Sequence, residues 1–485
     1  MPSLPPEPTG MPSLHQTPSP ARRPHGLILL LFLTILCVYA ETLYQGAFQF
    51  DDYNVILGNP GVHSLPAWFH TLEHGIRPLL KLSYTVNWIT GDGEILPFHL
   101  TNLLIHLLNT ALVFRLSSRF IENHSSITTM AHSHRATEIA LLSAAIFALH
   151  PIQTETISYI SGRSSALMTL FHLAGLLHHE NTWRKGASSK WLTPLLFLLA
   201  LASKETAITF PAALLLWDIT QGRRPREALR HALGSWLLLL GATLYVFSRP
   251  EYIAHLERSL HFNPLPVDLA SNALGMFWLL RQWWLPLWPN IDPDLPLRHH
   301  LDTNSLLALS LLAGLLLLTI RHRARHPGLF LALGWFILQT FPLHLLLPRL
   351  DIANERQMTL AAWPMALLLA ATLSRLPLAF RHIVPAMLLL AFASLTMMRN
   401  HDYRSEIALW QATAQQSPNK ARVHNNLGYA YAEAGRTEEA RTAYLCALHL
   451  DPQDLKAWNN LNKLPPPKTQ THPGKDQAET LPCPP

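Results

Sequence analysis

Two adjacent carboxylates, Asp51 and Asp52, directly follow the first apolar segment of the chain. Neighbouring like charges repel, so one of the two carboxyl groups is expected to have a raised pKa or a cationic partner. In an extended backbone the two side chains would point in opposite directions. Such a carboxylate can act as a general base, whereas the structural alternative is a solvated turn.

Four further groups of ionisable or polar residues recur along the chain, each between apolar runs. They are His150 with Glu155 and Arg163, Lys204-Glu205, the loop before Asp302, and Glu355-Arg356. The topology derived below places all of them on one membrane face with Asp51 and Asp52, and such convergence is what a site requires. The structural alternative for Glu355-Arg356 is an ion pair between spans. No Walker loop, dinucleotide fingerprint or nucleophile elbow occurs.

The composition indicates that membrane-spanning helices position these residues. Of the 485 residues, 49% are hydrophobic and 14% are charged, against roughly a quarter charged in ordinary globular domains. The formal charge is +6, but the basic residues lie in short loops between apolar runs. They are therefore topology signals and not a nucleic-acid footprint.

The N-terminal part divides into a tail, a span and a loop. Residues 1–25 are rich in Pro and Ser and predict a disordered cytoplasmic tail. Gly26 to Tyr44 predicts the first span, with a cleaved signal peptide as the alternative. Residues 46–97 predict the first extracytoplasmic loop, which carries the acidic pair and an interfacial helix around Leu65 to Leu72.

The second predicted span, about Phe98 to Ser117, carries a polar stripe. It consists of His99, Asn102, His106 and Asn109, whose spacing puts all four on one side of a helix. Polar side chains at membrane depth face a bundle interior or a wet cavity. Interhelical hydrogen bonding is the structural alternative to a functional role.

The sequence around Lys204-Glu205 permits two arrangements. Each flanking apolar arm is short for a full crossing, so the segment is either a helical hairpin with this pair at its outer tip or one span with a buried ion pair. The Arg-rich stretch from Arg223 to Arg230 should lie on the same side as Arg184 and Lys185. The positive-inside rule therefore favours the hairpin.

The later segments complete a membrane domain over residues 26–400. A Trp-rich stretch, Ala270 to Trp288, predicts a re-entrant or interfacial segment, since Trp prefers the headgroup level. Counting the remaining apolar runs gives about eleven crossings, with the N-terminus inside and the C-terminus outside. The predicted fold class is an all-α polytopic bundle followed by a helical repeat.

Residues 401–464 predict a tetratricopeptide repeat region. Pro418 and Pro452 lie 34 residues apart, and the motif beginning at Val423 recurs at the same offset from Ala457. One complete repeat and two halves are fewer than such a domain needs to stand alone, so we expect packing against the membrane domain or a partner. Residues 465–485 predict a disordered Pro-rich tail, and the spacing of the three cysteines indicates neither a disulfide framework nor a zinc site.

Seven segments, taken in order, resemble one known family. They are FQFDDYNVILGNP, RPLLKLSYTVNW, FHLTNLLIHLLNT, LHPIQTETISYISGRSS, ASKETAITFPAALLLWD, ANERQMTLAAWP and LWQATAQQSPNKARVHNNLGYAYAEAG. Together they are similar to the transmembrane and tetratricopeptide-repeat-containing O-mannosyltransferases, which have the GT-C glycosyltransferase fold, and to their bacterial relatives. The repeat is shorter than in eukaryotic members, and the segment from Arg249 to Asp302 keeps little of the family pattern beyond Phe262-Asn263-Pro264.

The resemblance implies transfer of a sugar, mannose in the family, from a polyprenyl-phosphate carrier to a hydroxyl on the outer membrane face, with inversion. Asp51 or Asp52 would be the base, and the leaving phosphate needs cations. Arg356, Arg163 and Lys204 are the candidates for phosphate binding. Supporting roles are expected for His150, Glu155, Glu205, Glu355, His99, Asn102 and His106. No cofactor or metal is expected, and a divalent ion at the acidic pair is the alternative.

The acceptor is expected to be protein Ser or Thr, with a lipid or glycan acceptor left open. A non-enzymatic membrane scaffold or lipid-carrier transporter in envelope assembly, recruiting partners through the repeat, is the alternative function. It predicts ionisable groups along a path across the bilayer, whereas an enzyme keeps them on one side. The short repeat points to a bacterial inner membrane, with the repeat extracytoplasmic and nucleic acid excluded as a partner.

Overall fold

The computed structural model describes residues 25–73, 75–124, 130–186, 191–249, 253, 257, 265–295, 301–346, 352–466 and 483. Within these ranges the chain forms helices and turns and no strand, which confirms the all-α class. The predicted disordered segments, residues 1–25 and 465–485, lie outside the described ranges except for His25, Pro465, Pro466 and Cys483. Phe262-Asn263-Pro264 also lie outside them.

The first half of the chain forms α1 (His25–Val38), α2 (Ala40–Gln45), η1 (Tyr53–Leu57), η2 (Pro60–Val62), α3 (Leu65–His70), α4 (Pro78–Gly91), α5 (Leu96–His124), α6 (Met130–Leu149), η3 (Pro151–Gln153), α7 (Thr154–Ser158), η4 (Ile160–Gly162), α8 (Arg163–Lys185), α9 (Leu192–Ser203), η5 (Glu205–Thr209), α10 (Phe210–Thr220), α11 (Pro225–His231) and α12 (Leu233–Phe247). The second half forms α14 (Leu265–Trp284), α15 (Thr303–Arg321), α16 (Pro327–Leu346), η6 (Glu355–Gln357), α17 (Met358–Leu373), α18 (Ile383–Asp402), α19 (Glu406–Gln416), α20 (Ala421–Glu433), α21 (Thr437–Leu450) and α22 (Leu455–Lys463).

Several helices begin where a short polar side chain caps the first turn. Ser64 accepts a hydrogen bond from Ala67 N, and Ser405 accepts one from Ala408 N at the start of α19. Such caps satisfy amides that have no partner within the helix. The sequence thus fixes the start of α19, the helix that joins the repeat to the membrane domain.

The apolar core of the bundle lies between α5, α6, α8, α10, α16 and α17. Trp217, Trp335 and Trp363 are fully buried there and contact one another edge-on or tilted. Such large side chains bury much apolar area, and their ring contacts add a further stabilisation of about 0.5–1.5 kcal/mol per pair. The core holds the ends of these helices, and therefore the loops between them, in fixed positions.

The number of full-length apolar helices is smaller than predicted. Among the described residues, α5, α15 and α18 are long and apolar enough to cross a membrane, and two bent pairs, within α6 to α7 and α11 to α12, raise the number to five. The count of eleven is therefore not confirmed. Several predicted spans form shorter helices, such as α1 with 14 residues and α9 with 12. At about 1.5 Å per residue, such helices are shorter than a hydrocarbon core of about 30 Å.

The chain reverses direction at Lys204-Glu205, as the hairpin interpretation predicted. Lys204 lies beside Ser165 at the start of α8, to which it donates a hydrogen bond of 2.7 Å. Asp218, near the end of α10, lies beside His179 in the last part of α8. Helix α9 therefore runs along α8 to one end of the bundle, and α10 returns to the other.

The Trp-rich stretch forms α14, a helix of 20 residues that packs against α15 and α16. Met276, Leu279 and Trp283 are buried, whereas Trp284 is 55% exposed. The stretch is thus helical from Ala270 to Trp284 and continues as turns to Trp288. Its predicted interfacial or re-entrant placement stays a prediction.

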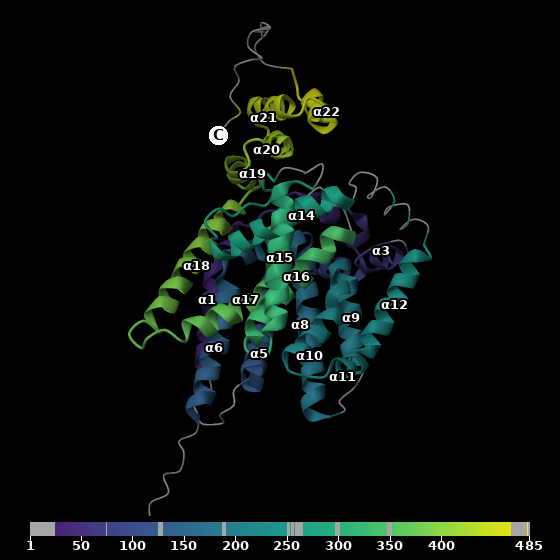
Figure 1. Ribbon diagram of the computed structural model, residues 1–485. Helices are drawn as coiled ribbons and strands as arrows, with labels where there is room; N and C mark the ends of the chain where they lie inside the picture. The colour runs from purple at the N-terminus through teal and green to yellow at the C-terminus, as the bar shows by residue number, and fades with distance from the viewer. Residues whose placement is uncertain are drawn as a thin grey trace, which may run out of the picture.

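The repeat helices α19 to α22 lie above one end of the bundle, as Figure 1 shows. Helices α20 and α21 pack closely because Gly428 has no side chain: a Cβ atom there would lie 2.6 Å from the Tyr444 ring. The expectation that the repeat packs against the membrane domain is confirmed. Asp292, in the loop after α14, accepts hydrogen bonds from Lys420 and Arg422 of the repeat at 2.5 to 2.8 Å.

The prediction of no disulfide is wrong. Cys446 of α21 is bonded to Cys483, with the two Cα atoms 5.2 Å apart. The spacing of the cysteines along the chain did not indicate which of them lie close together in the folded protein.

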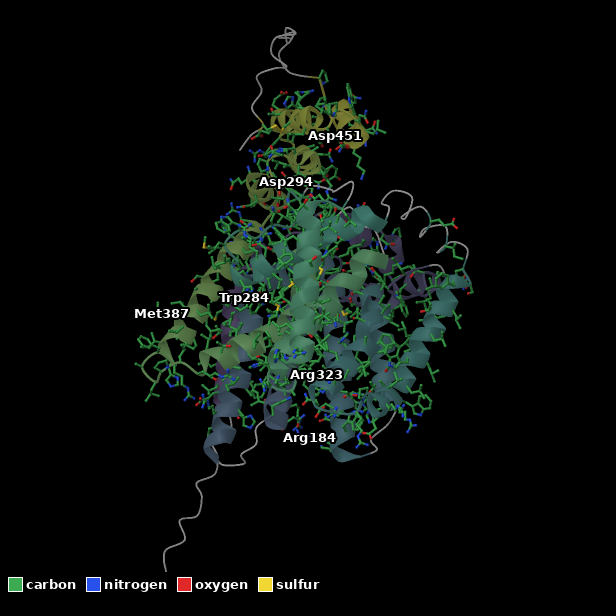
Figure 2. The ribbon with its side chains drawn as sticks, viewed as in Figure 1. Arg184, Trp284, Asp294, Arg323, Met387 and Asp451 are labelled. Carbon is green, nitrogen blue, oxygen red and sulfur yellow. A yellow bond between two sulfur atoms is a disulfide. The ribbon has the colours of Figure 1, made fainter. Side chains whose placement is uncertain are left out.

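The charged residues differ between the two ends of the bundle. Figure 2 shows Arg184 and Arg323 toward the end remote from the repeat, and Asp294 at the end next to it. The acidic pair also lies at the end next to the repeat, since Gln49 contacts Tyr403, which follows α18, and Phe50 contacts Glu406 of α19. This agrees with a basic face opposite the repeat.

Candidate active site

Asp52, in the loop between α2 and η1, makes hydrogen bonds within the loop and to the segment before α8. Its side chain is fully buried. One carboxylate oxygen accepts a hydrogen bond from Gln49 N at 3.0 Å, and the other accepts bonds from Ser161 N at 2.9 Å and from the Ser161 hydroxyl. Burial raises the pKa of Asp52 to about 7, although these hydrogen bonds act in the opposite direction. Asp52 therefore ties the loop to the start of α8.

Asp51 differs from its neighbour because its side chain is partly exposed. Its backbone N–H donates to the Tyr159 hydroxyl at 3.1 Å, and the side chain of Tyr159 also hydrogen-bonds Asp51. Burial, followed by the charges of Asp52 and Asp51, raises the pKa of Tyr159 well above its usual value, so the phenol stays protonated. Of the two carboxylates, Asp51 is therefore the one that is accessible to solvent.

Arg356 is held beside Tyr159 by a buried carboxylate. Glu155 accepts a hydrogen bond from Arg356 N at 2.8 Å, and its second oxygen lies 3.5 Å from Arg356 Nε. The guanidinium lies over the Tyr159 ring, 5.8 Å from its centre. Tyr159 therefore contacts both the accessible carboxylate and a cation.

Two hollows share Arg356. The first is lined by Ser165, Met168, Lys204, Thr206, Gln339, Arg356, Gln357 and Leu360. Lys204 is 5% exposed, and this hollow therefore brings together two cationic side chains and several hydrogen-bonding groups. Such a set suits an anion, with Arg offering paired donors and Lys a point charge.

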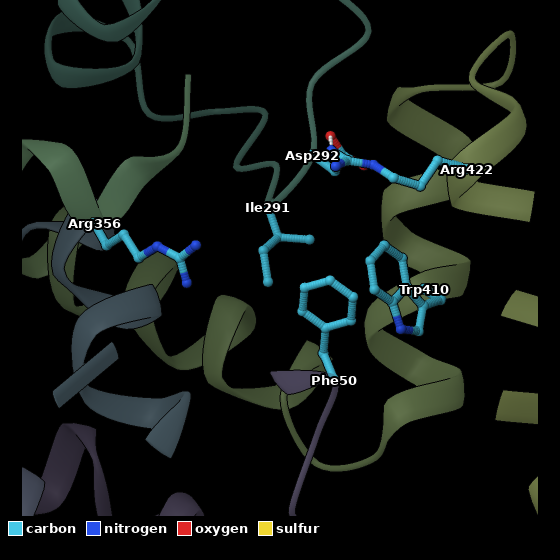
Figure 3. Close-up of a pocket in the computed structure, with 6 residues that line it drawn as sticks. All are labelled: Phe50, Ile291, Asp292, Arg356, Trp410 and Arg422. Carbon is cyan, nitrogen blue, oxygen red and sulfur yellow. Dashed lines mark hydrogen bonds and ion pairs between the residues drawn. The ribbon is translucent and has the colours of Figure 1, made fainter. Parts of the chain in front are cut away.

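The second hollow lies between the membrane domain and the repeat. It is lined by Phe50, Ile291, Asp292, Arg356, Trp410 and Arg422. Figure 3 shows the Phe50 ring beside the Trp410 ring, with Ile291 between them and Arg356, and the two rings lie edge-on to each other. Phe50 directly precedes Asp51, so this hollow adjoins the accessible carboxylate.

Arg163, predicted as a phosphate ligand, is fully buried among protein groups. Its three nitrogens donate to Asn102 at 2.6 Å, Ser83 at 3.1 Å and the carbonyl of Phe98 at 2.8 Å. Its guanidinium also lies 4.8 Å from the centre of the Tyr84 ring. These contacts join α4, α5 and α8, and Arg163 does not line either hollow.

The polar stripe of α5 faces the bundle interior, as predicted. Asn102 donates to the carbonyl of Ile157 at 3.0 Å, His106 contacts the carbonyl of Ala148 at 3.1 Å, and Asn109 donates to the carbonyl of Ala166. His99 is 1% exposed. These hydrogen bonds are contacts of interhelical packing, and none of these residues lines either of the two hollows.

His150 and Glu205 also have structural partners. His150 caps η3 by accepting from Ile152 N at 3.1 Å, and its other ring nitrogen contacts the carbonyl of Trp283 at 2.8 Å. Glu205 accepts two hydrogen bonds from Arg77, at 2.8 and 2.6 Å. Burial would raise the pKa of Glu205, but Arg77 outweighs it and lowers this pKa to about 2.

Glu355 faces away from its neighbour Arg356. It accepts a hydrogen bond from Asn290 N at 3.0 Å and lies 4.0 Å from Arg399. Burial raises the pKa of Glu355 to about 8, despite the opposing charge of Arg399. The two adjacent residues therefore do not pair with each other: Glu355 links the loop after α14 to α18, and Arg356 pairs with Glu155.

Residues that the sequence did not single out complete the site. Tyr159 lies in the segment LHPIQTETISYISGRSS, one of those that carry the family resemblance. Its position between the predicted site residues His150 and Arg163 could have identified it. Arg77 is the first residue of the segment RPLLKLSYTVNW, which also carries the family resemblance. Gln339 and Trp410, which line the two hollows, had no distinguishing feature in the sequence.

Within the described part of the chain, one group of three His, Cys, Asp or Glu ligand atoms lies close together, at His424, Cys446 and Cys483 of the repeat region. Two of its members, Cys446 and Cys483, are joined in the disulfide and are therefore not free to bind a metal. The expectation of a metal-free site stays a prediction.

The sequence comparisons agree with the predicted resemblance. The tetratricopeptide repeat family model matches residues 421–454. Protein O-mannosyl-transferase TMTC3 of Mus musculus is 24% identical over 501 residues, covering 90% of this chain and 52% of that protein. Human protein O-mannosyl-transferase TMTC4 is 24% identical, covering 89% of this chain and 67% of that protein. Tmtc2 of Drosophila melanogaster is 31% identical over 208 residues, which are 38% of this chain and 21% of that protein.

The chain spans about half the length of the mouse TMTC3 relative. Among solved structures, ArnT from Cupriavidus metallidurans bound to undecaprenyl phosphate has a TM-score of 0.46 and 14% sequence identity, covering 90% of this chain and 76% of that one.

Proposed function

We propose that this chain, which resembles the protein O-mannosyl-transferases, is a membrane glycosyltransferase that moves a sugar, mannose in the first instance, from a polyprenyl-phosphate carrier to a hydroxyl of protein Ser or Thr. The observation that supports it best is the position of Arg356. This cation borders both hollows, and through Tyr159 it lies next to the accessible carboxylate of Asp51.

In this proposal Asp51 is the general base. It takes the proton from the acceptor hydroxyl while the hydroxyl oxygen attacks the anomeric carbon of the sugar. The bond between that carbon and the phosphate oxygen breaks, and its electron pair leaves with the phosphate. Attack from the side opposite the phosphate inverts the configuration. Proton removal by a positioned carboxylate typically contributes 10²- to 10⁴-fold to such a rate.

The leaving phosphate is assigned to the hollow with Lys204 and Arg356. Cations placed where charge develops stabilise a transition state without reorganisation. Glu155 fixes the orientation of Arg356, and Ser165 fixes that of Lys204. The hollow between Phe50 and Trp410 is assigned to the acceptor, because it adjoins Asp51 on the side facing the repeat.

The membrane orientation belongs to the same proposal. We place Asp51, both hollows and the repeat on the extracytoplasmic face of a bacterial inner membrane, and Arg184 and Arg323 on the cytoplasmic face. The positive-inside rule supports this orientation, since the two arginines lie toward the end remote from the repeat (Figure 2).

The test is sugar transfer from radiolabelled polyprenyl-phosphate mannose by membranes that contain the full chain. Asp51→Asn should lower transfer at least 100-fold, and Arg356→Lys should be impaired because Lys cannot make the paired contacts of Arg. Asp92→Asn is the matched control, since Asp92 is exposed after α4 and lines neither hollow. Full activity of Asp51→Asn would contradict the proposal.

A transporter or scaffold remains the second candidate, because ionisable groups also cluster at the far end of the bundle. Arg223 pairs there with Asp218 and Glu180, each at 2.6 Å. Between the two ends, however, the α8 residue His172 packs against the rings of Phe210 and Trp335. A transporter would move labelled carrier across a vesicle membrane equally well with Asp51→Asn, and an enzyme would not show this activity.

A further inference from the structure

The loop that carries Asp51 is joined to the repeat at Gln49 and Phe50, and just after it the side chain of Tyr53 hydrogen-bonds Glu406. Gln49 Nε2 donates to the carbonyl of Tyr403 at 2.5 Å. Phe50 N donates to Glu406 Oε1 at 3.3 Å, and the Phe50 ring lies edge-on to Trp410 with the ring centres 5.3 Å apart. Both Glu406 and Trp410 belong to α19, the first repeat helix.

Phe50 has an unusual backbone conformation. Its φ is +47°, and Arg77 and Asp92 are the other non-glycine residues with a positive φ in the part of the chain that the structure describes. This left-handed region is disfavoured for L-residues, above all for bulky ones. Such a conformation persists where surrounding contacts stabilise it. Around Phe50, these are the contacts with the repeat at Gln49 and Phe50 and the contacts with the membrane domain at Asp51 and Asp52.

The conformation of Phe50 determines where the next two side chains point. If φ of Phe50 returned to the negative range, the chain after it would change direction. Asp52 would then leave its bonds to Ser161, and Asp51 would leave Tyr159. The membrane domain holds the loop after Phe50 through those bonds, and the repeat holds it at Gln49 and Phe50.

We propose that α19 is a positioning element of the active site: Glu406 and Trp410 hold Phe50 in its left-handed conformation and so keep Asp51 accessible. The repeat is therefore part of the catalytic geometry and not only a site for partners. The consequence for catalysis rests on the proposed function, in which Asp51 is the base.

Glu406→Ala removes the acceptor for Phe50 N, whereas Glu406→Gln keeps an acceptor oxygen at the same distance from the backbone. Holding a left-handed residue is worth about one to two kcal/mol, which corresponds to a factor of about 5 to 30 in population. In the full chain, Glu406→Ala should lower kcat about 5- to 30-fold with little change in the KM for acceptor, and Glu406→Gln should restore most of it. Glu439→Ala is the matched control, because Glu439 pairs with Arg436 on the exposed side of the repeat.

A background with Phe50→Gly sharpens the test, because glycine adopts positive φ without strain. If Glu406 acts by holding Phe50, the further loss caused by Glu406→Ala should be much smaller in the Phe50→Gly background, as a double-mutant cycle measures. Equal losses in both backgrounds would overturn the proposal, as would a Glu406→Gln variant that is as slow as Glu406→Ala.

Hydrogen exchange provides a readout that does not depend on activity. Amides of residues 48–58 should exchange faster in Glu406→Ala than in the wild type, Glu406→Gln or Glu439→Ala. Unchanged exchange in Glu406→Ala would overturn the inference. If Asp51→Asn is fully active but exchange changes as expected, the proposed function fails and the holding of the loop by α19 stands.

Discussion

The division of roles between Asp51 and Asp52 predicts that Asp52→Asn affects stability in a way that depends on pH. The two Asp52 oxygens accept from Gln49 N on one side and from Ser161 N and its hydroxyl on the other. An asparagine has one acceptor oxygen and one NH₂ donor. Whichever way it is oriented, the NH₂ group faces a backbone N–H, and a buried donor left without an acceptor costs about 1–3 kcal/mol.

In the wild type, ionisation of the buried Asp52 carboxyl at higher pH lowers the free energy of unfolding, and the variant lacks this effect because Asn does not ionise. Burial raises the pKa of Asp52 from 3.8 to about 7, so folding favours the protonated form. The stability from this preference is fully present below pH 3.8 and is lost as the pH rises to about 7. At about 1.4 kcal/mol per pH unit, the loss over this window is about 4 kcal/mol.

Asp52→Asn should therefore be destabilising near pH 4 and neutral or stabilising near pH 8. The measurement is the free energy of unfolding of the full chain in detergent at several pH values, for the wild type and the variant. The difference between them isolates Asp52, because other titrating groups such as Glu355 contribute equally to both.

Asp51→Asn is the matched control for this experiment. It makes the same chemical change at the adjacent position, where the side chain is partly exposed, and it keeps the Asp52 carboxyl with its hydrogen bonds to Gln49 and Ser161. A constant difference between Asp52→Asn and the wild type across the pH range would refute the reasoning, as would equal pH dependences for the two variants.

Three further predictions concern other parts of the molecule. Arg77→Ala should lower the free energy of unfolding by about 1 kcal/mol, because it breaks a partly exposed ion pair with Glu205. This difference from the wild type should disappear in acid as Glu205 becomes protonated. Thermal unfolding of both proteins at neutral pH and near pH 2 measures the difference. Gly428→Ala should loosen the repeat by about 1–3 kcal/mol through the clash with Tyr444, which limited proteolysis of the full chain detects. Cys446→Ser should release the C-terminal segment, making it sensitive to protease while transfer activity is unchanged.

The repeat and the order of the helices could be predicted from the sequence because both depend on local patterns. The 34-residue offset of Pro418 and Pro452 and the spacing of the α5 stripe are visible in the chain itself. The reversal at Lys204 followed from charges in the neighbouring loops. Each of these features needs only residues close in the sequence.

The internal arrangement of the site could not be predicted because its partners are distant in sequence. Asp52 and Ser161 are 109 residues apart, and Arg356 and Glu155 are 201 apart. Two adjacent carboxylates therefore looked equivalent, and Glu355-Arg356 looked like a pair. Arg163 was a good phosphate candidate by residue type, but Asn102, Ser83 and Phe98 surround it. The roles assigned to Asp51, Arg356 and Lys204 stay proposals until the variants are assayed.

Arg356 is a single side chain at the boundary of two hollows, and this has a thermodynamic consequence. A ligand in one hollow that shifts its guanidinium alters the wall of the other, so the two binding equilibria are linked. Such linkage is reciprocal: the factor by which an occupant of the Lys204 hollow changes affinity in the Trp410 hollow equals the factor in the reverse direction. Measured from either side, the coupling free energy should be the same, and Arg356→Ala should reduce it toward zero.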